Sequence, residues 1–149
     1  MSFRCFLPAW ITAWATAVFL PSAIIAYLGL SASAAAIGTG LHRLPASTWR
    51  VADDVGPAVK LMVGGILLLG FLSLGQMRRV GRGAAILVGL VAVAATLALI
   101  PTSLSRGFAH ALTGTRFDWT TTPLYLLGGI GAGLVFAIGV TRCQRAAAR

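Results

Sequence analysis

Charge is scarce in this sequence, and glutamate is missing altogether. Only 10% of the residues are charged, whereas a soluble domain normally carries about 25%. A soluble fold of 149 residues leaves much of its surface in water, and so few charges could not cover that surface. The shortage therefore excludes an ordinary soluble domain. Because 58% of the residues are hydrophobic, we expect lipid to surround most of the chain.

Acidic residues are also few, which leaves a formal net charge of +9. In a soluble protein this excess of basic residues would indicate nucleic acid as the partner. Here the basic residues stand at the ends of apolar runs and do not alternate with aromatic residues as on a nucleic-acid stacking surface. We therefore expect no nucleic acid as a partner and instead expect anionic lipid headgroups, which attract each nearby Lys or Arg by about 1 kcal/mol. The residues predicted to contact headgroups on the cytoplasmic side are Arg78, Arg79, Arg82, Arg142 and Arg145.

Long runs without charge predict four membrane-spanning helices. A transmembrane helix needs about 20 predominantly apolar residues, and the charges divide the sequence into windows of that length. We predict an all-α, polytopic integral membrane protein, a four-transmembrane-helix bundle that forms a single membrane domain over residues 1–149. The predicted spans are about 8–30, 57–77, 83–101 and 120–141, with outer loops at 42–56 and 102–119 and a cytoplasmic loop at 78–82.

The first apolar window is long enough to allow two interpretations. Cys5 to His42 contains no formal charge and would measure about 57 Å as one straight helix, nearly twice the hydrocarbon core. Pro21 lies in its middle, where proline kinks or breaks a helix. We predict one span that continues to residue 41 as an extension of small residues. The alternative is two short spans folded at Pro21, which would give five spans in all.

The distribution of Lys and Arg predicts the orientation, because short cytoplasmic loops are enriched in these residues. With four spans, seven basic residues fall on the side that holds both termini and loop 78–82, and five fall on the other. We therefore expect a multi-pass protein with both termini in the cytoplasm. Arg, Ala and Gly are abundant, as in GC-rich bacteria, which favours a bacterial inner (plasma) membrane. We assign Trp10, Trp49 and Trp119 to the aromatic belts at the two membrane surfaces.

Only two cysteines are present, and they lie near opposite ends of the sequence. Cys5 and Cys143 form no Cys-x-x-Cys motif. If both termini are cytoplasmic, both thiols face a compartment that keeps cysteine reduced. We therefore expect two free cysteines near the membrane interface.

Ionisable residues are absent from the central part of every predicted span. Proton relays and charged-substrate sites usually need such groups at membrane depth, so a proton-coupled transporter is disfavoured. Small multidrug transporters have a similar size, but their intramembrane glutamate has no counterpart here. No catalytic motif is present, and we expect no enzyme activity. His42 and His110 fall on the outer side and could hold a metal or a haem, but their spacing matches no metal motif, so we expect no cofactor and keep this site as an alternative.

Small residues four positions apart occur in three of the predicted spans. In lipid, this spacing allows two helix backbones to approach closely, which favours helix packing within the bundle or against another protein. The pairs are Gly29 with Ser33, Ala85 with Gly89, and Gly129 with Gly133.

These observations predict a non-catalytic membrane protein that acts as an accessory, scaffold or assembly subunit of a larger membrane complex. Its partners would be the lipid bilayer and other membrane subunits, or further copies of itself. One alternative is a transporter or channel component for a neutral or lipidic molecule. That alternative requires a polar strip converging on one cavity, made by Thr12, Thr16, Ser73 and Thr96. A second alternative is an outer-face haem or metal-binding redox subunit that uses His42 and His110.

Overall fold

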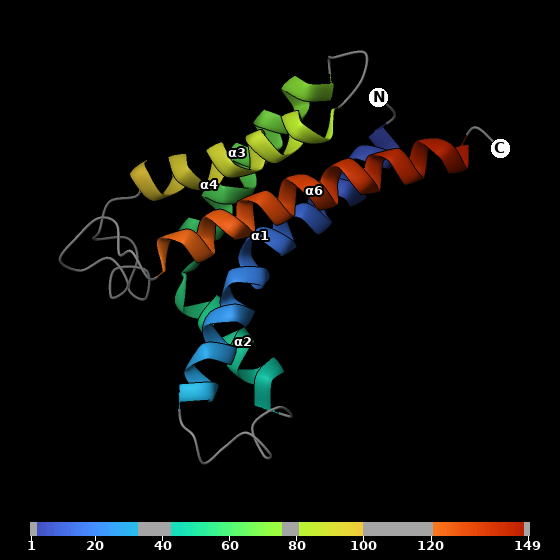
Figure 1. The fold of residues 1–149 in the computed structure, drawn as a ribbon. Helices are drawn as coiled ribbons and strands as arrows, with labels where there is room; N and C mark the ends of the chain where they lie inside the picture. The colour runs from blue at the N-terminus through green and yellow to red at the C-terminus, as the bar shows by residue number, and fades with distance from the viewer. Residues whose placement is uncertain (1–2, 33–42, 76–80, 100–120, 148–149) are drawn as a thin grey trace.

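The long apolar windows are helices in the computed structural model of the chain (Figure 1). The structure describes residues 3–32, 43–75, 81–99 and 121–147, and in the first of these ranges it describes side chains as far as residue 28. Four helices have the length and hydropathy of a membrane span, and these ranges contain no strand. The predicted all-α bundle of four spans is therefore confirmed. The long helices are α1 (Phe3–Ala32), α3 (Pro57–Gly75), α4 (Arg82–Leu99) and α6 (Thr122–Ala147).

A shorter helix, α2 (Leu44–Asp54), occupies most of the segment that we expected to be an outer loop. Pro45 lies in its first turn, where a missing N–H is tolerated. Gly56 then joins α2 to α3 with a φ of +80°, a backbone conformation that glycine adopts without steric strain. The connection is therefore a tight turn, and α3 begins at the very next residue.

Helix α1 is continuous through Pro21, so the alternative of two short spans is wrong. Figure 1 shows α1 bending near its middle, and an internal proline bends a helix because it lacks an N–H and its ring crowds the preceding turn. The bend is packed against α6 at Gly128. A Cβ added there would lie 2.9 Å from Pro21 Cδ and 2.9 Å from the Ala17 carbonyl oxygen. The predicted extension over residues 33–41 lies outside the described residues.

Helix α6 lies between α1 and α4 and makes most of the contacts that hold the bundle together. Its contact with α4 is between backbones. A Cβ added to Gly129 would lie 2.6 Å from the carbonyl oxygen of Gly89, and one added to Gly133 would lie 2.6 Å from the carbonyl carbon of Ala85. Both distances are too short for a real Cβ, so glycine is required at these positions if the helices are to keep this spacing.

Three phenylalanines join α1, α3 and α6 in the core of the bundle. The rings of Phe71 and Phe136 are stacked with centroids 3.8 Å apart, and Phe6 meets Phe136 edge-on at 5.6 Å. Phe71 and Phe136 are fully buried. Aromatic pairs contribute about 0.5–1.5 kcal/mol beyond the area that they bury, so this cluster helps to hold α1, α3 and α6 together.

Gly129→Ala is expected to destabilise the bundle, because the new methyl group must push α4 and α6 apart. Overpacking of this kind typically costs about 1–3 kcal/mol. Thermal unfolding of the purified protein in detergent measures the change. Gly65→Ala is the matched control, because a Cβ at Gly65 meets nothing within 4 Å, and alanine there should be neutral or slightly stabilising. Equal effects of the two substitutions would contradict the close α4–α6 contact.

Candidate functional site

The side chains most able to perform chemistry do not form a metal site in the part of the chain that the structure describes. His42 and His110 lie outside the described residues, so the haem or metal alternative stays a prediction. Asp53 and Asp54 lie at the end of α2, and Asp53 pairs with Lys60 at 3.4 Å. The Asp53 side chain is 77% exposed, and so this ion pair contributes little to stability.

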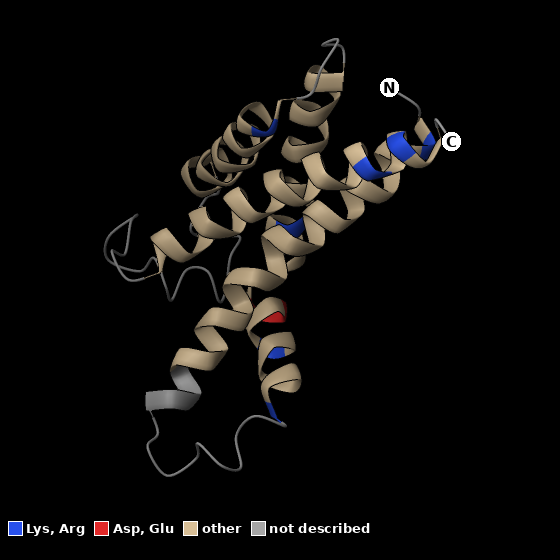
Figure 2. Cartoon of the chain, turned by 45° about the vertical axis from the view of Figure 1, so that its right-hand side comes forward, with Lys and Arg blue, Asp and Glu red and all other residues tan. Residues whose placement is uncertain are grey.

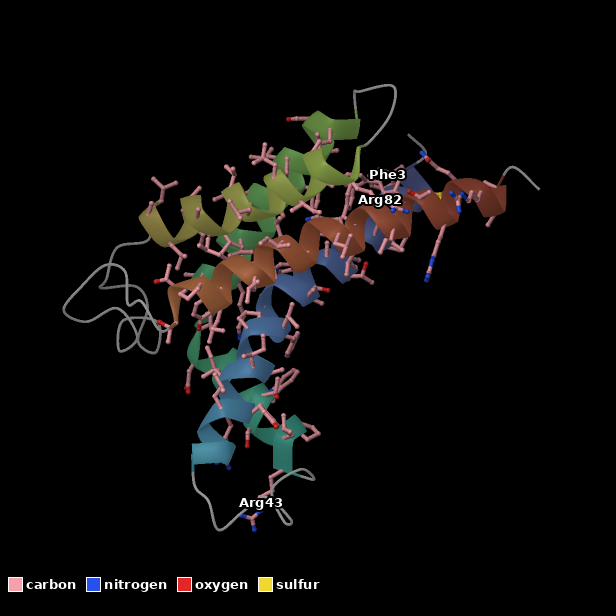
Figure 3. The ribbon with its side chains drawn as sticks, viewed as in Figure 1. Phe3, Arg43 and Arg82 are labelled. Carbon is pink, nitrogen blue, oxygen red and sulfur yellow. A yellow bond between two sulfur atoms is a disulfide. The ribbon has the colours of Figure 1, made fainter. Side chains whose placement is uncertain are left out.

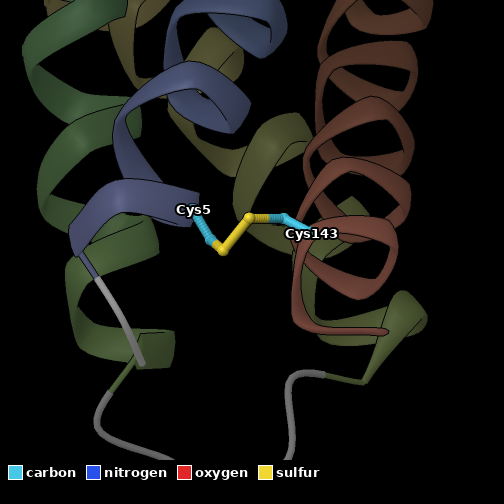
Figure 4. Close-up of a disulfide and its surroundings, with 2 residues drawn as sticks. All are labelled: Cys5 and Cys143. Atoms are coloured by element: carbon cyan, nitrogen blue, oxygen red, sulfur yellow. A yellow bond between two sulfur atoms is a disulfide. The ribbon is translucent and has the colours of Figure 1, made fainter. Parts of the chain in front are cut away.

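The two cysteines are joined in a disulfide between the first turn of α1 and the last turns of α6 (Figure 4). Their Cα atoms are 5.6 Å apart, and Cys5 is buried. The expectation of two free cysteines is therefore wrong. That expectation rested on a cytoplasmic location of both cysteines. The observed pairing follows instead from the antiparallel packing of α1 on α6, which also brings Ala9 against Gly139.

Basic residues gather at the end of the bundle that holds both chain termini (Figure 2). Arg142 and Arg145 are exposed near the end of α6, and Arg82 is exposed at the start of α4. Arg145 lies in the last helical turn, where a positive charge interacts favourably with the helix dipole. Arg78 and Arg79 lie outside the described residues, and the headgroup contacts of all five arginines stay a prediction.

Trp10 and Trp14 connect α1 to α3. The indole N–H of Trp10 donates to the carbonyl of Gly64 at 3.1 Å, and that of Trp14 donates to the carbonyl of Lys60 at 2.8 Å. The two rings are stacked with centroids 5.8 Å apart. Gly64 makes room for them, since a Cβ there would lie 3.0 Å from Trp14 Nε1.

The polar atom of Trp10 thus binds another helix, and the assignment of Trp10 to an aromatic belt stays a prediction. Trp14 had not been singled out, although its i+4 spacing from Trp10 signals one shared helix face. Trp49 is 64% exposed on α2 and packs beside Phe19. Trp119 lies outside the described residues.

The hydroxyl groups expected to form a polar strip bond to their own helices instead. Thr12 donates to the carbonyls of Pro8 and Ala9, and Thr16 donates to that of Thr12. Ser73 and Thr96 likewise donate to carbonyls four residues earlier, at 2.9 and 2.8 Å. The polar strip is therefore not formed, and the transport alternative loses the feature on which it depended.

The small residues predicted for helix packing fall into two groups. Ala85, Gly89, Gly129 and Gly133 meet at the α4–α6 contact described above. Gly29 lies near the end of α1, and its partner Ser33 lies outside the described residues. The structure thus brings together two of the three pairs, and both are used inside the bundle.

An apolar face on α3 and α4 is left uncovered by the rest of the described chain. A groove of about 180 Å³ runs between the two helices, lined by Ile66, Gly70, Leu87, Val88, Val91 and Ala92. Elsewhere on its outer side, α3 exposes Leu61 at 68%, Leu69 at 67% and Leu72 at 44%. Gly65 lies among these leucines with open space around it. We call these residues of α3 and α4 the α3–α4 face.

A second cavity, enclosed by α1, α3, α4 and α6 together with Val55, is much smaller. It measures about 20 Å³ and is bounded by Val59, Lys60, Thr96 and Tyr125 among others. This is room for about one water molecule, and it is far below the size of a small-molecule site.

Neither a known protein family, nor a curated protein, nor a solved structure matches this chain. What it binds must therefore be inferred from its own surface.

The disulfide is expected to stabilise the bundle by about 2–4 kcal/mol, because it restrains two residues separated by 138 positions. Thermal unfolding of protein purified without reductant should show a lower melting temperature for Cys5→Ser. Adding a reductant should lower the wild type to the level of the variant and leave the variant unchanged. The expected contribution of the disulfide to stability would be contradicted if the melting temperature of the wild type stays the same after mass spectrometry has shown that the reductant freed both thiols.

Trp14→Phe should lower the free energy of unfolding by about 0.5–1.5 kcal/mol, since it removes an indole donor and leaves the ring stacking in place. Trp49→Phe is the control, because that side chain is exposed on α2. Chemical unfolding in mixed micelles compares the two variants. Equal losses would mean that the bond to the Lys60 carbonyl adds nothing to stability.

Proposed function

We propose that this chain is a non-catalytic membrane protein that serves as an accessory, scaffold or assembly subunit of a larger membrane complex. The observation that carries the proposal is the α3–α4 face, which combines an apolar groove with exposed leucines on the outer side of α3 and which no other described helix covers. Lipid chains can fill such a groove, but a partner helix of complementary shape fills it with more contacts, and close packing is what drives helix association in membranes.

Several polar side chains in the described part of the bundle are already engaged in hydrogen bonds to its backbone. Trp10 and Trp14 donate to backbone carbonyls of α3, and the described hydroxyls of Thr12, Thr16 and Thr96 bond within their own helices. Polar groups that are satisfied internally stabilise a scaffold and are not available to a substrate. This supports a structural role over an enzymatic one.

The chemistry of the α3–α4 face indicates what kind of partner would fit it. Every residue that lines the groove is apolar, and the exposed leucines Leu61, Leu69 and Leu72 carry no polar atom in their side chains. Gly65 provides a site where a second backbone can approach, in the manner of small residues at other membrane helix contacts. We therefore propose an apolar transmembrane helix, from another subunit or from a second copy of this chain.

We further propose a bacterial inner membrane with both termini in the cytoplasm, since the arginines at the terminal end of the bundle satisfy the positive-inside rule. This orientation has a consequence for the disulfide, which lies at the same end. The cytoplasm keeps thiols reduced. A cytoplasmic position would therefore act against the bond that joins Cys5 to Cys143 in the structure, so the state of these two cysteines in cells reports on the orientation.

Orientation and cysteine state should therefore change together. A fluorescent protein fused after residue 149 is expected to fluoresce in cells, because such reporters mature on the cytoplasmic side, and trapping thiols in those cells with a permeant alkylating agent should label both cysteines. The opposite orientation predicts a dark fusion and cysteines protected as a disulfide. The proposed relation between compartment and disulfide would be contradicted if the fusion fluoresces but the cysteines are labelled only after a reductant has been added.

Gly65→Leu tests the docking role of the α3–α4 face. The new side chain enters open space, so the bundle should fold, but the leucine should block a partner helix. Purification from native membranes in mild detergent should recover partner subunits, or a dimer, with the wild type and much less of either with Gly65→Leu. Thr12→Leu, on the exposed surface of α1, is the control and should retain the partner. A wild type that purifies as a solitary monomer would contradict the proposal.

A further inference from the structure

Part of the molecule stands apart from the four-helix bundle. Beyond the bend at Pro21, α1 runs beside α2, and the two helices leave the bundle together (Figure 1). Ala26 of α1 and Ala52 of α2 are buried, and the ring of Phe19, just before the bend, lies 5.8 Å from that of Trp49. We call this pair of helical segments the arm. Figure 3 shows Arg43 at its tip, at the opposite end of the molecule from Phe3 and Arg82.

The length of α1 indicates where the arm lies relative to the bilayer. From Phe3 to Pro21 the helix extends about 28 Å, close to the hydrocarbon thickness of about 30 Å. The 11 residues of α1 beyond Pro21 add about 16 Å along the axis after the bend, past the thickness that the first part of the helix already crosses. If Phe3, beside Arg4, starts at one edge of the hydrocarbon, the segment beyond Pro21 lies in the opposite headgroup layer.

The charges of α2 and α3 also place the arm in the headgroup layer. Asp53 and Lys60 form their ion pair at the base of the arm, where a charged pair would not be stable in hydrocarbon. Arg43 and Arg50 lie farther toward the tip and are exposed. The arm therefore begins where the hydrocarbon ends.

The surface of the arm is nevertheless unsuited to water. Tyr27 is 54% exposed and Trp49 is 64% exposed, and Phe19 and Leu20, just before the bend, are both 38% exposed. Helix α2 combines these groups with charge, since it also carries Arg50, Asp53 and Asp54. Exposed aromatic rings next to charged residues are typical of segments in the headgroup region, where one part of the side chain is in contact with acyl chains and another with water.

We infer that the arm is a lipid-binding element that lies in the headgroup layer of the leaflet opposite the chain termini. Tyr27 and Trp49 insert at the boundary between headgroups and acyl chains, and Arg43 and Arg50 bind lipid phosphates. The occupant of the exposed surface is the bilayer interface itself. This site is separate from the α3–α4 face, so either surface can exist without the other.

Spin labels on the full-length chain in vesicles of phosphatidylcholine and phosphatidylglycerol test this inference. Labels are placed singly at positions 27, 69 and 147 in a Cys5→Ser, Cys143→Ser background. Oxygen, which concentrates in hydrocarbon, and a water-soluble nickel complex report depth through their collision rates with each label. Ala147, exposed in the last turn of α6 and outside the arm, provides the water reference, and Leu69 of α3 provides the hydrocarbon reference.

Position 27 is expected to have an intermediate depth, with a collision rate with nickel severalfold below that at 147 and severalfold above that at 69. A label at 49 repeats the measurement if Tyr27→Cys does not fold. Nickel access equal to that at 147 would place the arm in water and overturn the inference. A profile equal to that at 69 would place it in hydrocarbon, and protection from both reagents would indicate a protein partner. Either result would also overturn the inference.

Discussion

The backbone contact between α4 and α6 is the constraint on which the rest of the arrangement depends. Gly89, Gly129 and Gly133 allow the two helices to approach until their peptide groups touch. This contact leaves the other sides of α6 free to receive the bend of α1 at Gly128 and the ring of Phe71 from α3. In lipid, where apolar side chains gain little by leaving their surroundings, such closeness supplies most of the attraction between helices. The glycines therefore stabilise the bundle by allowing this close contact.

Polar atoms inside the bundle are also constrained by the lipid, because hydrocarbon offers them no hydrogen bonds. Each indole donor of Trp10 and Trp14 reaches a carbonyl of α3, and the hydroxyl of Ser22, which is fully buried, donates to Val18 at 2.7 Å. An unsatisfied donor at this depth would be costly. These donors are satisfied inside the bundle, and the surfaces proposed for recognition are the apolar α3–α4 face and the aromatic arm.

The helices could be predicted from the sequence, because the spacing between charges is a local property. Arg82 begins α4 next to the predicted start of its span, and Pro57 begins α3 at the predicted residue. Lateral neighbours could not be predicted in this way. The partners of Cys5 and Trp14 depend on which helices pack side by side, and neither charge spacing nor orientation contains that information. The arm was missed for a related reason, since the absence of charge in α1 does not distinguish hydrocarbon from the headgroup layer.

The pairing of Cys5 with Cys143 makes the bundle a closed covalent ring. Its two half-cystines belong to the first and the last of the four spans to leave the ribosome, because synthesis proceeds from the N-terminal side. The ring can therefore close only when α6 has entered the membrane and found its place against α1. A chain in which α6 has not been inserted cannot form the disulfide, so the bond is restricted to molecules with all four spans in place.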